Sequence, residues 1–281
     1  MTFTLPLHSA SKYVLNKGFV KMVDCMPRVI PSEAKKLACD SAVVQAARVS
    51  YAQGLKSHKT DTSLINYLYK NKHTSPFEMV KFKFHVKAPI FIARQWFRHR
   101  MSNYNEISGR YTELKEELYE PEKIPIQSSI NKQLSDTSVD LNNNIFVKKL
   151  YDEYMDGTKN QYKMYNKLMK HSVSRENARI GLPLNLFTEF YWSIDLHNLL
   201  NFLNLRNSSY AQYEIKVYAE AIEEIVKPFC PVTMTARENN KTITFSIDQL
   251  KCLDIFEFNF NKLKDREKHE INTILNKDNT F

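Results

Sequence analysis

The chain has 281 residues, of which 43% are hydrophobic and 25% are charged, and its formal net charge is +9. This composition is ordinary for a globular protein, and the positive charge favours anionic partners. No apolar run reaches the roughly 18 residues of a membrane span, and the first residues lack the basic and apolar regions of a signal peptide. The five glycines form no Gly-x-Gly pair, which excludes a Rossmann fingerprint and a Walker phosphate loop.

Hydrophobic periodicity predicts the elements of the first hundred residues. Residues 18–24 read as a short strand, and Asp40 is expected to cap a helix rich in Ala and Val. A second helix fits residues 62–72. Residues 80–87 alternate strictly between apolar and basic side chains, which predicts a half-buried strand. A further helix is expected to start near Pro89, because proline suits the first helical turn.

Longer and more polar segments follow. The patterns predict, in order, a polar loop (120–145), a long helix (145–170), a short helix opened by Ser174 and ended by Pro183, a strand (186–194), a helix capped by Asp195 that runs to Leu205, and a helix (210–227) opened by a capping box of Ser209 with Gln212. Residues 236–281 are charged and include one amphipathic helical pattern. We therefore expect an α/β (α+β) fold with a small mixed or antiparallel sheet flanked by helices.

Four cysteines are scattered along the chain without Cys-x-x-Cys spacing: Cys25, Cys39, Cys230 and Cys252. This spacing predicts neither a zinc ribbon nor a disulfide framework. Buried free thiols in a reducing cytoplasm account for them, so we expect a cytoplasmic protein without a metal site.

Residues 98–111 carry the densest group of candidate functional side chains. They open with Arg-His-Arg at 98–100, and consecutive residues of a helix lie about 100° apart, so these three bases must fan out. Buried cations are costly unless an anion balances them. Glu106, Ser108 and Arg110 follow at alternate positions and would point the same way in an extended segment, where they suit a sugar phosphate.

A solvated basic turn is the simpler interpretation of such a charge run. The preceding residues 89–97 are largely apolar, so the three basic residues directly follow an element that we expect to be buried. This placement favours a cleft, where arginine is suited to phosphate.

The Arg-His-Arg motif followed by seven residues and Ser108 resembles the signature of flavin-dependent thymidylate synthases (the ThyX family). The resemblance covers roughly residues 15–235 and extends through these blocks: Gln95, Asn105-Glu106, Ser108-Gly109-Arg110-Tyr111, His73-Thr-Ser-Pro-Phe-Glu78, 82–94, Arg179, Leu182-Pro-Leu-Asn-Leu186 and Asn201-Phe-Leu-Asn-Leu-Arg206. It implies a catalytic domain over residues 1–235, with residues 236–281 as a charged extension of unknown role.

The resemblance also implies a reaction. The uracil of deoxyuridine monophosphate (dUMP) is methylated at C5 to give dTMP, with 5,10-methylenetetrahydrofolate as carbon donor, FAD as cofactor and NADPH as reductant, and tetrahydrofolate is released. It further implies a homotetramer whose active sites are shared between subunits, with no nucleic-acid or membrane partner.

Site residues follow from the matching positions. Arg206 would be catalytic, stabilising negative charge on the uracil because a guanidinium is a poor base. The dUMP contacts would be Gln95, Arg98, Glu106, Ser108, Gly109, Arg110, Arg179 and Arg206. The FAD contacts would be His73, Ser75, Arg98, His99, Arg100, Asn105, Glu106, Asp195, His197 and Asn201. Ser75 replaces the family's usual Thr, and Asp195 its usual Asn, which adds negative charge beside the flavin or serves only as a helix cap.

Three alternatives remain open from the residues alone. Ser108 could act as a nucleophile, although His99 is nine residues away and no third orienting group is visible. A basic nucleic-acid-binding protein would fit the charge and the aromatic content, but no recognition motif is visible. A phosphate-handling enzyme without flavin is the third, and the missing glycine loop weakens it.

Overall fold

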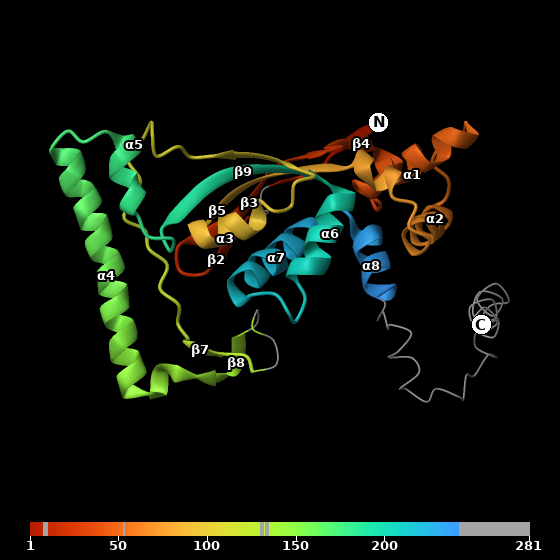
Figure 1. Cartoon of the computed structure of the whole chain (residues 1–281). Helices are drawn as coiled ribbons and strands as arrows, with labels where there is room; N and C mark the ends of the chain where they lie inside the picture. The colour runs from red at the N-terminus through yellow and green to blue at the C-terminus, as the bar shows by residue number, and fades with distance from the viewer. Residues whose placement is uncertain (8–10, 53, 130–131, 133–134, 242–281) are drawn as a thin grey trace, which may run out of the picture. The chain divides into compact units, whose positions relative to one another are not determined.

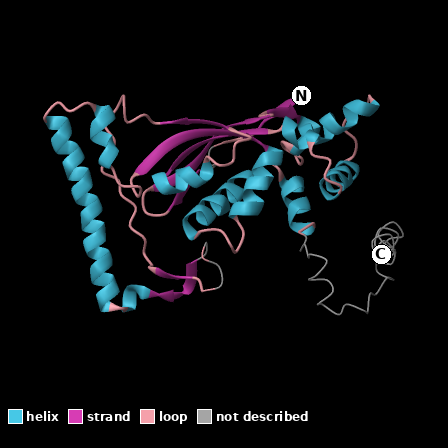
Figure 2. Ribbon diagram, in the orientation of Figure 1, coloured by secondary structure: helices cyan, strands magenta, loops and turns pink. Residues whose placement is uncertain are grey.

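An antiparallel sheet of five strands organises the fold (Figures 1 and 2). The computed structural model describes residues 1–7, 11–52, 54–129, 132 and 135–241. In spatial order the strands are β2 (Ser11–Val14), β3 (Gly18–Met26), β5 (Lys81–Pro89), β9 (Phe187–Asp195) and β6 (Asn103–Glu106). Each neighbouring pair is antiparallel, which confirms the predicted α+β class and decides between a mixed and an antiparallel sheet.

Strand β5 lies at the centre of the sheet, and its alternating sequence buries one of its faces. Phe82, Phe84 and Val86 are at most 1% exposed and point into the core, whereas Lys81 and Lys83 are exposed on the other face. The predicted half-buried strand is therefore confirmed. Lys87 departs from the pattern: it is buried, and its ammonium lies 2.7 Å from the Glu117 carboxylate, so its charge is paired.

Three helices pack against the apolar face of the sheet: α3 (Ile90–Trp96), α6 (Leu196–Arg206) and α7 (Tyr213–Val226) (Figure 1). Trp96 of α3 contacts Trp192 of β9 edge-on at 5.2 Å and Phe202 of α6 at 5.1 Å. All three rings are fully buried. Burying each contributes about 2–3 kcal/mol, so this aromatic centre locks α3 and α6 against the sheet.

The remaining described elements lie around this core. They are β1 (Thr2–Thr4), β4 (Val29–Pro31), α1 (Asp40–Arg48), α2 (His58–Lys70), the 3-10 helix η3 (Ser75–Met79), β7 (Pro125–Gln127), β8 (Ser135–Asp140), α4 (Ile145–Lys170), α5 (Arg175–Ala178) and α8 (Pro231–Asn239). Short 3-10 turns cover 32–34, 49–51, 141–143 and 179–181. A second, smaller core joins α4 and α5 through Tyr162, Tyr165 and Ala178 with Leu118 and Leu186.

Several predicted boundaries were wrong, each for a local reason. Residues 120–145 are not one loop, because β7 and β8 pair in an antiparallel ribbon there. The helix predicted at 210–227 starts at Tyr213, and Gln212 at its N-cap makes no capping hydrogen bond. Asp40 is the first residue of α1 rather than its cap. Its buried carboxylate instead accepts hydrogen bonds from the backbone of Val232 and Thr233, and so caps α8.

Contacts divide the chain into one compact unit, Met1–Asn240, and a second, Lys241–Phe281. The domain boundary predicted after residue 235 falls within helix α8. The amphipathic pattern expected beyond it lies largely outside the described residues, and so does Cys252. Cys25, Cys39 and Cys230 are buried free thiols, as expected. Within the described residues no helix is long and apolar enough to cross a membrane.

Candidate active site

The Arg-His-Arg motif begins where α3 ends. Its backbone continues the turn through His99 N–H, which donates to the Trp96 carbonyl at 3.0 Å. The His99 carbonyl accepts from the Ser102 hydroxyl at 2.6 Å and the Tyr104 hydroxyl at 2.9 Å. These bonds hold His99 half-buried, whereas residues 98 and 100 are exposed. The predicted fanning is confirmed, with the imidazole turned inward.

His99 and Arg206 form the central contact of the site. Arg206 Nε donates to His99 Nε2 at 3.0 Å, and Arg206 Nη2 donates to the Gln95 carbonyl at 3.3 Å. A guanidinium only donates, so Nε2 carries no proton and the ring proton of His99 lies on Nδ1. Burial, together with the Arg206 charge, lowers the pKa of His99 to about 4, so the imidazole is neutral at pH 7.

Gln95 and Gln212 complete this cluster. The Gln95 side-chain amide donates to the Gln212 side-chain oxygen at the start of α7. Phe202 of α6 packs against the His99 ring at 4.8 Å. We call Gln95, His99, Arg206 and Gln212 the arginine cluster. It unites three predicted site residues that are up to 111 positions apart along the chain.

Residues 106–110 form the second group, and they are not extended as predicted. Strand β6 ends at Glu106, whose carboxylate accepts from the Thr188 hydroxyl of β9 at 2.7 Å. A turn follows, in which Ser108 Oγ accepts from the Arg110 N–H at 3.3 Å. Glu106, Ser108 and Arg110 therefore do not line one strand face, because the turn replaces the pleat. Arg110 lies 3.8 Å from Glu176, and both side chains are exposed.

Gly109 brings this turn against Arg179. A Cβ at Gly109 would lie 3.3 Å from Arg179 Cδ and 3.1 Å from Leu114 Cδ1, tighter than ordinary contact. A larger residue here would force the Leu114 and Arg179 side chains to shift by a few tenths of an ångström, so glycine favours the close approach. Ser108, Gly109, Arg110 and Arg179, named here the phosphate turn, offer a hydroxyl and two guanidinium groups, which suit an oxyanion.

Apart from the Arg-His-Arg motif, the predicted flavin residues lie at or just before η3, on β6, and on α6 with its N-cap. The Asp195 carboxylate accepts from Asn198 N–H at 2.9 Å and caps α6, and its oxygens also accept from the Asn198 amide. His197 Nε2 and Asn201 Nδ2 are 3.3 Å apart on one helix face. His73 stacks on Tyr67 at 5.8 Å. Ser75, which begins η3, and Asn105 of β6 are both exposed.

Among the described residues, no hydrogen bond or ion pair joins the arginine cluster, the phosphate turn and the start of α6 to one another. Arg98 and Arg100 form no ion pair with another described residue. In the same part of the chain, no group of three His, Cys, Asp or Glu could hold a metal ion.

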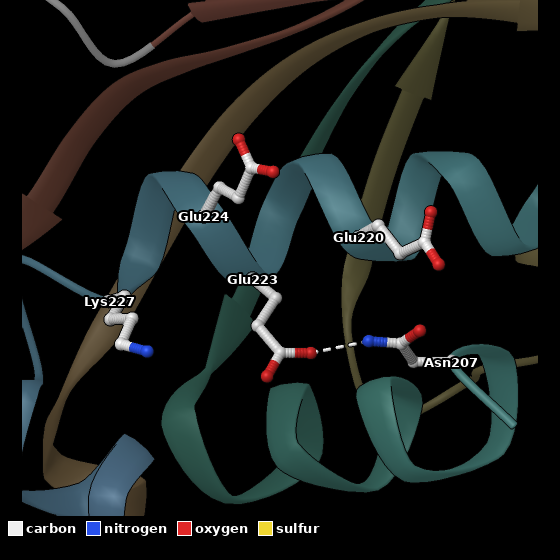
Figure 3. Close-up of a pocket in the computed structure, with 5 residues that line it drawn as sticks. All are labelled: Asn207, Glu220, Glu223, Glu224 and Lys227. Atoms are coloured by element: carbon white, nitrogen blue, oxygen red, sulfur yellow. Dashed lines mark hydrogen bonds between the residues drawn. The ribbon is translucent and has the colours of Figure 1, made fainter.

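Two surface hollows lie outside the predicted site. One of about 250 Å³ is lined by Asn207, Glu220, Glu223, Glu224 and Lys227 (Figure 3). The other, of about 630 Å³, is lined by Val147, Leu150, Tyr151, Glu153 and Tyr154 of α4. Neither hollow is lined by a residue assigned to the site from the sequence.

Sequence reasoning missed several residues of this site. The sequence indicated Gln212 only as part of a capping box. In the structure its side chain is hydrogen-bonded to that of Gln95, which is 117 positions away. Thr188 and Tyr104 are visible only once the strand register is known, because β6 pairs with β9. No local pattern marks Phe202 as a contact of His99.

Comparisons with known proteins place the chain in a family. A family model described as "Thymidylate synthase complementing protein" matches residues 35–232. The chain is 51% identical over 228 residues to a flavin-dependent thymidylate synthase of Thermus thermophilus, covering 81% of this chain and 78% of that protein. It is 49% identical over 225 residues to the enzyme of that description from Ehrlichia ruminantium, covering 79% and 71%.

A solved structure agrees with these relatives. The crystal structure of PolB, a UMP/dUMP methylase from Streptomyces cacaoi bound with 5-Br dUMP, superposes with a TM-score of 0.67 at 27% identity, covering 81% of this chain and 97% of that chain. Sequence identity, coverage and fold all lead to one conclusion: this chain belongs to the family of flavin-dependent thymidylate synthases.

Proposed function

We propose that this chain converts dUMP to dTMP, taking the carbon from 5,10-methylenetetrahydrofolate, using FAD and NADPH, and releasing tetrahydrofolate. The observation that carries the proposal is the contact of Arg206 with the neutral imidazole of His99. Arg206, the candidate catalytic residue, contacts a residue of the Arg-His-Arg motif, which supports a shared site for the substrate and the flavin.

Arg206 acts on the uracil by charge. Uracil C5 is a poor nucleophile, and electron density builds there more easily when the ring oxygens and N3 carry negative charge. Burial lowers the pKa of Arg206, but from a value so high that the group remains a cation at pH 7. Arg206 therefore stabilises the growing charge rather than removing a proton. The neutral His99 holds the guanidinium without competing for that charge.

The phosphate turn grips the 5′-phosphate. Arg110 and Arg179 supply guanidinium groups, and Ser108 supplies a hydroxyl, whose role is binding rather than nucleophilic attack. The Arg110–Glu176 pair is long and exposed, so it contributes little and yields readily to a phosphate dianion. Gln95, Arg98 and Glu106 complete the dUMP contacts in this proposal, on the base and sugar side.

The residues fit an FAD. Exposed Arg98 and Arg100, without ion-pair partners among the described residues, suit the pyrophosphate and an electron-rich ring. His73, Ser75, Asn105, His197 and Asn201 offer exposed or half-exposed polar groups around it. The flavin, when bound and reduced, supplies the hydride that turns the transferred carbon into a methyl group. Asp195 serves the site as the cap that fixes the start of α6.

A homotetramer with shared sites explains why the groups are separate. In such a tetramer, one set of anionic ligands would be surrounded by groups from different subunits. These groups are the phosphate turn, the arginine cluster and the start of α6. The surplus of cations, +9 overall, fits this arrangement. A cytoplasmic location and a catalytic domain ending near residue 235 remain predictions.

Replacing Arg206 tests the proposal. Arg206→Ala should lower dTMP formation by at least about 10²-fold, the cost of losing one preorganised charge-stabilising donor, while FAD binding persists. Arg28→Ala, which removes an exposed guanidinium paired with Asp24, is the matched control and should leave turnover unchanged. Near-normal dTMP formation by the Arg206→Ala protein would refute the assignment.

A further inference from the structure

The last turn of α6 contacts a partly buried ion pair that joins α7 to α8. Arg237 of α8 lies 2.7 Å from one carboxylate oxygen of Glu223 on α7. The other oxygen of Glu223 accepts from the Asn207 amide at the end of α6. Arg237 Nε donates to the Asn204 side-chain oxygen at 2.7 Å. Figure 3 shows Glu223 and Asn207 facing each other, with Glu224 turned away.

The pair is sheltered enough to be rigid. The side chain of Arg237 is 5% exposed and that of Glu223 is 18% exposed. A buried ion pair survives only with good geometry and with its remaining donors and acceptors satisfied. Here both carboxylate oxygens and two guanidinium nitrogens are used, so the four side chains hold one arrangement.

These contacts tie down one side of the helical turn that carries Arg206. Successive residues of a helix are about 100° apart, so Asn204 and Asn207 share one side of α6 and Arg206 projects from another. One side is tied to the ion pair, while Arg206 reaches His99 and the Gln95 carbonyl. Any rotation of the last turn would move all of these contacts together.

Each carboxylate of the acidic hollow beside this network has a basic neighbour within the described part of the chain. Glu223 is paired with Arg237. Glu220 lies 3.9 Å from Lys216, and Glu224 pairs with Lys12. Of the three carboxylates in Figure 3, Glu223 alone has a close and sheltered partner, so we look for its role in the helices that it joins.

We propose that the Glu223–Arg237 pair, acting through Asn204 and Asn207, is a positioning device for the Arg206 guanidinium. This inference rests on the proposed function, because it assigns the network to the step that Arg206 serves. A displacement of about 1 Å in a charge-stabilising group can cost up to about 10²-fold in rate. Loss of the network should therefore slow the chemistry at uracil more than it weakens dUMP binding.

The test compares Asn207→Ala and Glu223→Gln with the control Glu220→Gln, in the FAD-loaded full chain. Glu220 lines the same hollow on the same helix and loses the same charge, but no hydrogen bond or ion pair among the described residues ties it to α6. We expect kcat for tritium release from C5-labelled dUMP to fall about tenfold in both test variants. The KM for dUMP should change less than about threefold, and the control should match wild type.

A second readout separates positioning from general damage. NADPH oxidation by the bound flavin without dUMP does not use Arg206, so it should be unchanged in both test variants. Asn207→Ala removes a single hydrogen bond and keeps the Glu223–Arg237 pair, so the test remains valid if Glu223→Gln unfolds. In the Arg206→Ala background, adding Asn207→Ala should leave the dUMP dissociation constant unchanged.

Two results would overturn the inference. The first is a normal kcat for tritium release in folded Asn207→Ala protein, with wild type active and Arg206→Ala impaired, which leaves the proposed function intact. The second is an equal fall in tritium release and in dUMP-independent NADPH oxidation. If wild type releases no tritium at all, the proposed function itself fails and the inference fails with it.

Discussion

The neutral His99 makes stability depend on pH in a defined window. Its pKa is about 4 in the folded chain against an ordinary 6.5, so the unfolded chain takes up the proton first as pH falls. The contribution of His99 is complete above pH 6.5 and is lost as pH falls toward 4. At about 1.36 kcal/mol per pH unit the full difference would be about 3.4 kcal/mol, and partial solvent exposure reduces this to about 1–2 kcal/mol.

Urea unfolding of wild type and His99→Gln, measured between pH 7.5 and 4.5, isolates this contribution. Glutamine can still accept from Arg206 but does not titrate, and all other ionisable groups are common to both proteins. We expect wild type to lose about 1–2 kcal/mol more than His99→Gln as the pH falls. Parallel stability profiles across the window would show that His99 is not held neutral by Arg206 and burial.

Three further changes test separate parts of the structure. Ser108→Ala should raise the KM for dUMP about tenfold and lower kcat less than about threefold, since a lost bond to phosphate weakens binding; a trapped covalent adduct in wild type would restore the nucleophile reading. Gly18→Ala should destabilise the fold by about 3 kcal/mol in urea, because the new Cβ would lie 2.0 Å from the Tyr218 hydroxyl; an unchanged midpoint contradicts this. Asp195→Ala should cost about 1 kcal/mol as a lost cap while Asp195→Asn costs almost nothing, and equal losses would remove the capping role.

Much of the fold could be predicted from local patterns. Helix α4 was predicted at residues 145–170, as observed, because its apolar positions recur with helical spacing over seven turns. Strand β5 was equally clear from its alternation. Strand β6 was missed because its four residues, Asn-Tyr-Asn-Glu, carry no apolar alternation and are ordered only by pairing with β9. Such an edge strand depends on tertiary contacts.

The candidate site could be predicted in its membership but not in its geometry. The resemblance supplied residues such as Arg206 and Arg179, whose local sequence alone would suggest surface arginines. The hydrogen bond from Arg206 to His99 spans 107 positions, and no periodicity encodes such a contact. The network around Glu223 was invisible for the same reason, since its partners come from α6, α7 and α8.

The most direct test of the account is release of tritium from C5-labelled dUMP, with methylenetetrahydrofolate and NADPH, by protein stripped of FAD and then reloaded. The account predicts release only after reloading, in step with dTMP formation, and release at least about 10²-fold slower with Arg206→Ala. Equal release without FAD, or none from reloaded wild type, would contradict the claim that this site holds dUMP against a flavin.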